Sequence, residues 1–322
     1  MGAMGLGRVA LSAFTKQFGY ELARIVADEP PTPQKFSFND PILQSAEAHA
    51  SSGDFDKAFR ALRQMSLADF GWLLMAPPPE FRALTAMLPK MASKEVQRQW
   101  TGSDGPDLLL QSLLFVKSIE AVFPRVTGRP LHDATILDFG CGWGRLIRLM
   151  LWFSDPKNIY GVDAWNKSLE VCDRDRVPGN LARSDTIPDN LPFDDSSFDL
   201  IYAFSVFTHL SERPMMAAQR AIRAKIKSDG IFVITVRPPE YWGDDPVSSD
   251  PQKYQDVLRS HKERGFAYVP HQDLPKIDGE VMYGDTSITL DYIRANWKSW
   301  NICGHDHNFV DRHQIIVFLK PV

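Results

Sequence analysis

The sequence has few cysteines and no long apolar run. Its three cysteines, Cys141, Cys172 and Cys303, are scattered and odd in number. They form neither a disulfide framework nor a zinc-binding pattern, which is typical of a reducing compartment. No stretch approaches the roughly 18 apolar residues that a membrane span needs. The first residues are too weakly apolar for a secretion signal. We therefore expect a cytoplasmic protein without a transmembrane segment.

The chain also has no block of positive charge. Its 322 residues include 36 lysines and arginines against 40 aspartates and glutamates, which gives a net charge of −4. Without a basic cluster, nucleic acid is not an expected partner. A hydrophobic content of 44% is enough to build a sizeable core. These values indicate a globular protein that acts on a small partner, and they leave a homo-oligomer open.

Helical patterns dominate the first part of the chain. Residues 28–41 contain four prolines and are predicted to be a linker. Apolar residues then recur at helical spacing over three stretches, 42–75, 80–99 and 107–123. Pro89 is expected to interrupt the second stretch, and Pro124 is expected to end the third. We predict a helical N-terminal region over residues 1–125.

Short apolar strands alternate with helices in the rest of the chain. The predicted strands are 135–139, 158–163, 179–185, 198–206, 230–236 and 313–321. Alternation of helices with continuous apolar strands is typical of a parallel sheet covered on both faces. Residues 126–322 are therefore predicted to form one doubly wound α/β domain.

A glycine-rich turn, ILDFGCGWGR at 136–145, follows the first strand. Its spacing differs from the G-x-G-x-x-G of dinucleotide-binding turns, because Gly144 comes one position early after Gly140 and Gly142. Asp138 would also repel a pyrophosphate. A cationic ligand without phosphate, S-adenosylmethionine, fits this turn better. Glycines allow the backbone to approach the ligand, and the next helix N-terminus is expected to take its carboxylate.

Two further acids end the next strands. Asp163 ends the second strand, where a carboxylate can accept both ribose hydroxyls, and it can also cap the following helix. Asp185 ends the third strand and can accept from the adenine amino group. The backbone N–H of Thr186 or Ile187 can then meet a ring nitrogen. All three acids lie at the carboxyl edge of the predicted sheet, where open α/β folds bind ligands.

The segments DFGCGWGR, YGVDAW and RSDTIPDNLPFDDSSFDLIYAFSVFTHL resemble the class I S-adenosylmethionine-dependent methyltransferases over roughly residues 130–236. The resemblance implies a Rossmann-like, mostly parallel sheet with an antiparallel last strand, to which HQIIVFLKPV is similar. The segments SVFTHL and YGDTSITLDYIRANW, with HQ before the last strand, are more loosely similar to bacterial methyltransferases of polysaccharide and glycolipid pathways.

This resemblance also implies a set of cofactor-binding residues. Asp138 and Gly140 would lie near the methionine end, and Asp163 with its neighbour Ala164 near the ribose. The backbone of Phe204 and Ser205 would face the methionine portion.

A lid is expected over about residues 96–106. In this fold the segment before the core often lies across the cofactor, so Trp100, Thr101 and Gly102 are expected to contact it. The alternative is a helix start in which Ser103 or Asp104 is the N-cap.

His209 is the candidate catalytic base, because it follows the fourth strand and histidine titrates near neutral pH. Glu212 could orient it. The alternative is a structural histidine that bonds to backbone.

The loop RPPEYWGDDPVSSD follows the fifth strand, where the acceptor is expected. Arg237, Tyr241 and Trp242 are predicted to line the acceptor site. Asp244 and Asp245 could bind a metal or take a proton, but a solvated turn is the favoured reading.

His305, His307 and His313 do not have zinc spacing with cysteines, so we expect solvated loop histidines and no metal.

Together these features predict methyl transfer from S-adenosylmethionine to a small-molecule or glycan acceptor, at oxygen. Transfer to nitrogen or carbon of a small metabolite, and a non-catalytic partner subunit that only binds the cofactor, remain alternatives.

Overall fold

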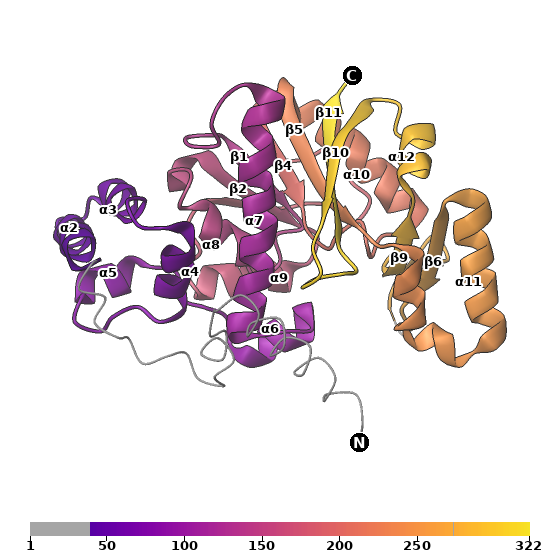
Figure 1. The fold of residues 1–322 in the computed structure, drawn as a ribbon, viewed down its shortest axis with the longest axis horizontal. Helices are drawn as coiled ribbons and strands as arrows, with labels where there is room; N and C mark the ends of the chain where they lie inside the picture. Colours follow the sequence, from indigo (N-terminus) through magenta and orange to yellow (C-terminus); the bar gives the residue numbers. More distant parts are fainter. Residues whose placement is uncertain (1–38, 273) are drawn as a thin grey trace, which may run out of the picture. The chain divides into compact units, whose positions relative to one another are not determined.

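A computed structural model describes residues 39–272 and 274–322 (Figure 1). They form two compact units, which divide between Leu113 and Leu114, inside helix α7 (Gly105–Thr127). Most of the linker expected at 28–41 lies outside the described residues. Pro124 was expected to end α7, but it lies in the last turn of that helix, which continues to Thr127. No helix of the described ranges is long and apolar enough to cross a membrane.

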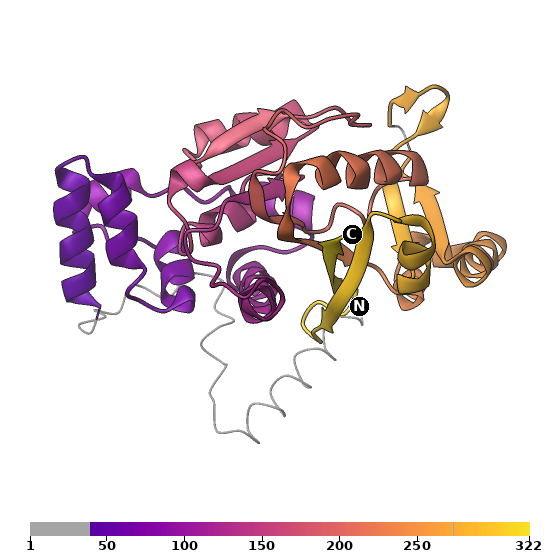
Figure 2. The same ribbon diagram turned by 90° about the horizontal axis from the view of Figure 1, so that it is seen from above.

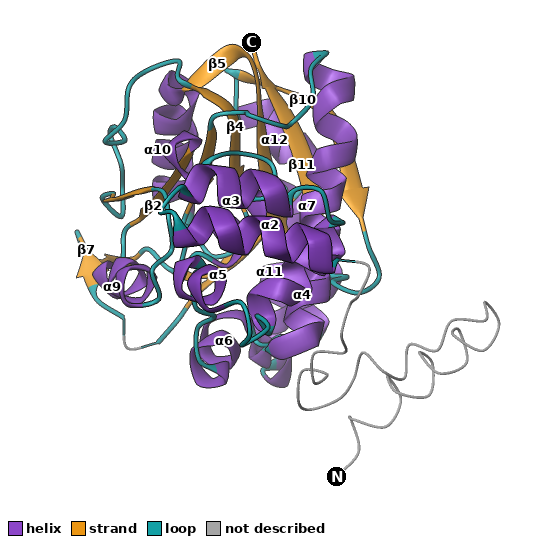
Figure 3. Ribbon diagram, turned by 90° about the vertical axis from the view of Figure 1, so that its left-hand side faces the viewer, coloured by secondary structure: helices purple, strands orange, loops and turns teal. Residues whose placement is uncertain are grey.

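The first unit is helical in its described part, as predicted (Figure 3). Its helices are α2 (Asp40–Ser51), α3 (Phe55–Leu62), α4 (Leu67–Met75), α5 (Arg82–Met87) and α6 (Lys94–Thr101), before the start of α7. The stretch 42–75 is divided into three helices because side chains cap new starts. Asp54 accepts from the N–H of Lys57, and Ser66 accepts from that of Asp69.

The second unit is built on a seven-stranded sheet. Its strands are β1 (Ile136–Phe139), β2 (Ile159–Asp163), β3 (Asn180–Arg183), β4 (Phe198–Ala203), β5 (Ile226–Val236), β10 (Trp300–His307) and β11 (Ile315–Pro321). The strand order is β10-β11-β5-β4-β1-β2-β3. Strands β1 to β5 pair in parallel, and β11 is antiparallel to both β5 and β10. This confirms the doubly wound, Rossmann-like sheet with an antiparallel last strand.

Helices cover the sheet on both faces (Figure 2). They are α8 (Arg145–Met150), η2 (Pro156–Asn158), α9 (Asn166–Arg174), α10 (Glu212–Lys225) and α12 (Leu290–Asn296), with the part of α7 that follows Leu114. Helix α10 buries Met215, Ala218 and Ile222, which recur at helical spacing, in one core with Phe232 and Ile234 of β5. The strands therefore end in a rigid edge.

An insertion between β5 and α12, residues 237–289, forms a separate small layer beside the sheet (Figure 1). It contains η3 (Pro239–Gly243), η4 (Pro246–Ser249), α11 (Pro251–Arg264), β6 (Phe266–Pro270), β7 (Lys276–Ile277), β8 (Glu280–Val281) and β9 (Gly284–Ile288). Strands β6 and β9 pair antiparallel. The N–H of Gly284 donates to the carbonyl of His209 at 2.8 Å, and that of Thr286 to Thr208 at 2.9 Å. These bonds fix the insertion to the loop that follows β4.

The edge strand β10 depends on one buried hydrogen bond. The indole N–H of Trp300 donates to Oε1 of Gln219 at 2.9 Å, and both side chains are buried. Trp300→Phe leaves that oxygen buried without this donor, so we expect a loss of about 1–3 kcal/mol in the free energy of unfolding in urea. The double variant Trp300→Phe, Gln219→Leu should recover part of it. A single variant as stable as the wild type would contradict this role.

Candidate cofactor and acceptor site

The three glycines of the turn after β1 all have a left-handed backbone. Their φ angles are +75° at Gly140, +54° at Gly142 and +74° at Gly144. A Cβ at Gly140 would lie 2.4 Å from the side chain of Val206, whereas one at Gly142 would meet no atom within 4 Å. The turn is therefore closed against the core at Gly140 and open at Gly142, where a ligand can approach the backbone.

The N–H groups of this turn are already used within the protein. Those of Gly140 and Cys141 donate to the carbonyl of Val162 at 2.7 and 3.1 Å, and that of Gly144 donates to Cys141 at 2.9 Å. A cradle for pyrophosphate needs such groups to be free. The geometry therefore disfavours a dinucleotide, in agreement with the glycine spacing.

Asp163, at the end of β2, holds the turn in place. Its Oδ2 accepts from the N–H of Gly142 and its Oδ1 from that of Trp165, both at 2.8 Å. Burial raises the pKa of Asp163, and the two backbone donors act in the opposite direction. An ionised carboxylate has about four acceptor positions. The hydroxyl of Ser168 is a third donor to this carboxylate. One position remains for a ribose hydroxyl, so capping of α9 and cofactor binding are compatible.

Asp138 is a buried acid at the end of β1. Burial raises its pKa to about 8, with a further increase from Asp163, while Tyr202 and Arg145 favour the charged form. Asp138 forms no ion pair among the described residues, and a sulfonium or ammonium would supply a partner of opposite charge. Asp138 therefore fits a cationic cofactor.

The remaining predicted cofactor residues vary in their exposure. Asp185 and Thr186 lie two and three residues after the end of β3 at Arg183 and are exposed, and Ala164 is half-buried beside Asp163. Ser205 has a φ of +57°, rare outside glycine, and its N–H donates to Oγ1 of Thr235 at 2.7 Å. That N–H is therefore bonded within the protein, and contact of the Phe204 and Ser205 backbone with the methionine portion stays a prediction.

The predicted lid lies in the other compact unit. Trp100 and Thr101 end α6, and Gly102 is its C-cap with a φ of +75°. The next helix, α7, starts at Gly105. Contact of this segment with the cofactor stays a prediction.

His209 lies between a carbonyl group and a cation. Its Nδ1 is 2.8 Å from the carbonyl oxygen of Gly284, which can only accept, so Nδ1 carries the proton. Its Nε2 then accepts from Nη2 of Arg237 at 3.1 Å. Burial lowers the pKa of His209 to about 4, and Arg237 lowers it further, whereas Asp285 opposes the shift. The expectation that His209 titrates near neutral pH is therefore wrong.

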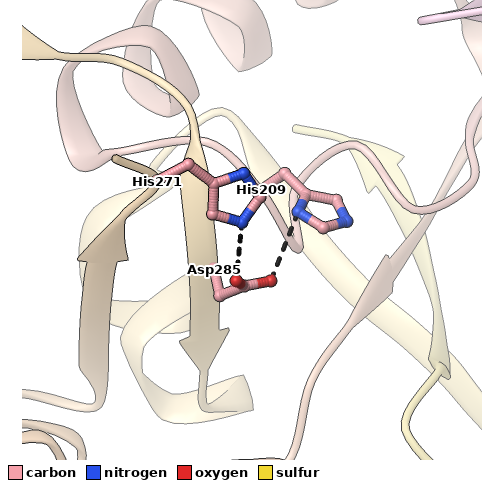
Figure 4. Close-up of side chains that lie close together, drawn as sticks. All are labelled: His209, His271 and Asp285. Carbon is pink, nitrogen blue, oxygen red and sulfur yellow. Dashed lines mark hydrogen bonds and ion pairs between the residues drawn. The ribbon is translucent and has the colours of Figure 1, made fainter. Parts of the chain in front are cut away.

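Asp285 of β9 joins two histidines (Figure 4). Its Oδ2 is 2.7 Å from Nε2 of His271, and its Oδ1 is 3.5 Å from Nδ1 of His209. Nη1 of Arg237 donates to the same Oδ1. Burial raises the pKa of Asp285, but Arg237 and the histidines more than offset this, so its pKa is below the ordinary value. Asp285 is a carboxylate at neutral pH.

The loop after β5 contributes less to an open site than the sequence suggested. Trp242 is fully buried, packs in the core of the insertion and donates to Ser287. The prediction that it lines the acceptor site is therefore wrong. Arg237 is also buried and bonded to Asp285. Tyr241 is half-buried, and the Arg237 guanidinium lies 3.9 Å from its ring centre.

The acids of this loop are not a solvated turn. Asp245 is buried and accepts from the N–H of Val247 and the hydroxyl of Tyr241 at 2.8 and 2.9 Å. Asp244 is exposed but pairs with Arg312 and, at 2.9 Å, with Nε2 of His313. His313 is therefore a bonded residue and not the solvated histidine that we expected.

His305 and His307 are both exposed, and they lie on β10.

His209, His271 and Asp285 are close enough together to suggest a metal site, since one ligand atom of each lies within 4.8 Å of the others. The proton on Nδ1 of His209 argues against this, because a ligating nitrogen needs a free lone pair. The guanidinium of Arg237 already supplies a cation to Asp285. His209, His271 and Asp285 are better described as a hydrogen-bonded cluster.

The sequence analysis missed His271, Tyr283 and Asp285. Tyr283 stacks on His209 with ring centres 5.0 Å apart and planes 8° apart. The motif YGDTS contains two of these residues, but only pairing of β6 with β9 brings them beside His271.

The elevated pKa of Asp138 predicts that binding of S-adenosylmethionine is coupled to loss of the proton of Asp138. The folded protein keeps this proton up to about pH 8, whereas the unfolded chain loses it near 3.8. Stability should therefore fall as pH rises across that range, and Asp138→Asn should remove this fall. A bound cation favours the charged form of Asp138. Binding of S-adenosylmethionine at pH 7 should therefore release a proton, and the affinity should increase as the pH approaches 8.

Calorimetric titration in two buffers of different ionisation enthalpy measures this release. The exposed Asp229→Asn variant is the control, and pH-independent binding without proton release would contradict the assignment.

Comparison with known proteins shows what part of the chain is similar to a methyltransferase domain. Residues 137–234 match the model of a methyltransferase domain. A search of curated proteins finds no match. Among solved structures, an S-adenosylmethionine-dependent methyltransferase from Clostridium acetobutylicum is 14% identical, with a TM-score of 0.44 over 70% of this chain and 96% of that one. Magnesium protoporphyrin IX methyltransferase from Synechocystis with bound SAH is 14% identical, with a TM-score of 0.44 over 70% and 97%.

The methyltransferase match covers the strands and turns that carry Asp138, the three glycines and Asp163. The strand order and the buried, cation-seeking Asp138 agree with it. Over residues 137–234 the chain is therefore similar to methyltransferase domains, and Asp138 at this edge fits the cationic cofactor S-adenosylmethionine.

Proposed function

We propose that the enzyme methylates a hydroxyl oxygen of a small-molecule or glycan acceptor in the cytoplasm, with His271 as the proton acceptor. The supporting observation is the His271–Asp285 pair beside the loop that follows β4. A hydroxyl must lose its proton as its oxygen bonds to the methyl carbon, whereas an amine of low pKa needs no base. A prepared base therefore favours oxygen as the acceptor atom.

His271 has the geometry of an oriented base. Because Asp285 is ionised, it accepts from Nε2–H of His271 at 2.7 Å, which leaves the lone pair of the neutral ring on Nδ1. The side chain of His271 is 42% exposed, so an acceptor can reach it. Among the residues that the structure describes, Nδ1 has no hydrogen-bond partner. This arrangement matches a base that a carboxylate orients.

In this proposal His209 positions other groups and takes no proton. Both of its nitrogens are bonded, and its neutral ring supports Tyr283. Burial raises the pKa of Tyr283 to about 12, and Asp285 and Asp163 add to this increase. Tyr283 is 46% exposed and can line the boundary between cofactor and acceptor.

The transfer step follows from these positions. The sulfonium of the bound cofactor supplies a methyl group that is already activated. With S-adenosylmethionine bound, an acceptor oxygen would take the methyl group as the carbon–sulfur bond breaks, and Nδ1 of His271 would take the hydroxyl proton. In-line alignment can contribute ~7–11 kcal/mol, and a base roughly 10²–10⁴-fold in rate. We include Asp185 and Thr186 at the adenine, and Trp100 to Gly102 as a lid, in the same proposal.

His271→Asn should lower kcat for a hydroxyl acceptor by about 10²–10⁴-fold, because it removes the base. The affinity for S-adenosylmethionine should stay within about twofold, because His271 is not proposed to touch the cofactor. The assay follows formation of the demethylated cofactor with phenols, methyl glycosides and primary amines. The exposed His305→Asn variant on β10 is the control.

Two outcomes would contradict the proposal: a His271→Asn enzyme of undiminished kcat, or a wild type that methylates only the amines. Cofactor binding with no transfer to any acceptor of the panel would favour a non-catalytic subunit.

A further inference from the structure

Arg145 is a partly buried cation directly after the glycine-rich turn. It follows Gly144 and starts α8. Its guanidinium lies 4.5 Å from the ring centre of Phe204, which directly follows β4. Within the described part of the chain it forms no hydrogen bond or ion pair.

Two comparable arginines of this unit are paired. Nη1 of Arg148 donates to the carbonyl of Trp143, and its Nη2 lies 4.0 Å from Asp175. Arg237 is bonded to Asp285 and Thr208. A guanidinium withdrawn from water without such a partner is costly, which indicates that an anion completes the site of Arg145.

The charges that face Arg145 show where this anion belongs. Burial lowers the pKa of Arg145 to about 10, and Asp311 and Asp138 oppose the shift without forming an ion pair. Arg145 therefore remains a cation at neutral pH. Asp138 pairs in register with Tyr202 across β1 and β4, where the strand order reverses. Arg145 and Asp138 thus offer opposite charges at this switch point, which is the ligand-binding position of an open α/β sheet.

We propose that Arg145 binds the carboxylate of the cofactor's methionine portion, while Asp138 faces its ammonium group. The two side chains supply one charge for each end of the zwitterion. Helix α8 has only six residues, so in this proposal the side chain of Arg145 supplies the carboxylate site in addition to the start of α8. A guanidinium can also hold a carboxylate through two parallel hydrogen bonds. This inference depends on the cofactor alone and is independent of His271 and of the acceptor.

The test compares S-adenosylmethionine with its decarboxylated analogue, which keeps the sulfonium and the amine. Calorimetry of the full chain should show that the wild type binds S-adenosylmethionine about 10- to 100-fold more tightly than the analogue. Arg145→Met keeps an apolar chain against Phe204 but removes the charge. This variant should bind S-adenosylmethionine more weakly by the same factor, whereas its affinity for the analogue should equal that of the wild type. The exposed Arg220→Ala on α10 is the control.

Arg145→Lys keeps the charge and should restore part of the preference, which preserves the test if Arg145→Met does not fold. Equal weakening of both ligands would show a structural role and overturn the proposal. An unchanged preference in either variant would also overturn it, and would assign the anion to the acceptor.

Discussion

The carboxylate of Asp163 is the interaction on which the cofactor half of the site depends. It bonds at once to the N–H of Gly142 in the turn after β1 and to the N–H of Trp165 before α9. Two crossover connections are therefore fixed to the end of one strand. Loss of such a cap costs about 0.5–2 kcal/mol. Because the remaining lone pair faces the same edge, the group that shapes the turn is also the proposed ribose ligand.

The buried charged side chains at this edge of the sheet are of two kinds: those that other side chains neutralise, and those that are left for a ligand. Arg237 is buried, but Asp285, Thr208 and His209 satisfy it. Asp138 and Arg145 are withdrawn from water without an ion pair of their own among the described residues. The methionine portion of S-adenosylmethionine would supply an ammonium group for Asp138 and a carboxylate for Arg145. The acceptor half is organised differently, since the bonds between the insertion and the loop after β4 hold His271 and Asp285 next to His209.

Local patterns in the sequence predicted most of the strands and the acids at their ends, because parallel strands place consecutive ends at one edge. Asp138 and Asp163 are found there as expected. The acceptor half could not be predicted in this way. His271 and Asp285 are brought together by antiparallel pairing within an insertion, and no periodicity indicates that pairing. Trp242 was assigned to a surface because a loop of prolines and aromatics does not show which ring is buried. Edge strand β10 was missed because most of its residues are exposed or half-buried.

The most direct measurement is a calorimetric titration of the wild type and Asp163→Ala with S-adenosylmethionine, its demethylated product and a nicotinamide dinucleotide. The account predicts micromolar binding of the first two ligands to the wild type, marked weakening of both in the folded variant, and no heat from the dinucleotide. Binding of the dinucleotide alone, or equal affinities in the wild type and Asp163→Ala, would contradict it.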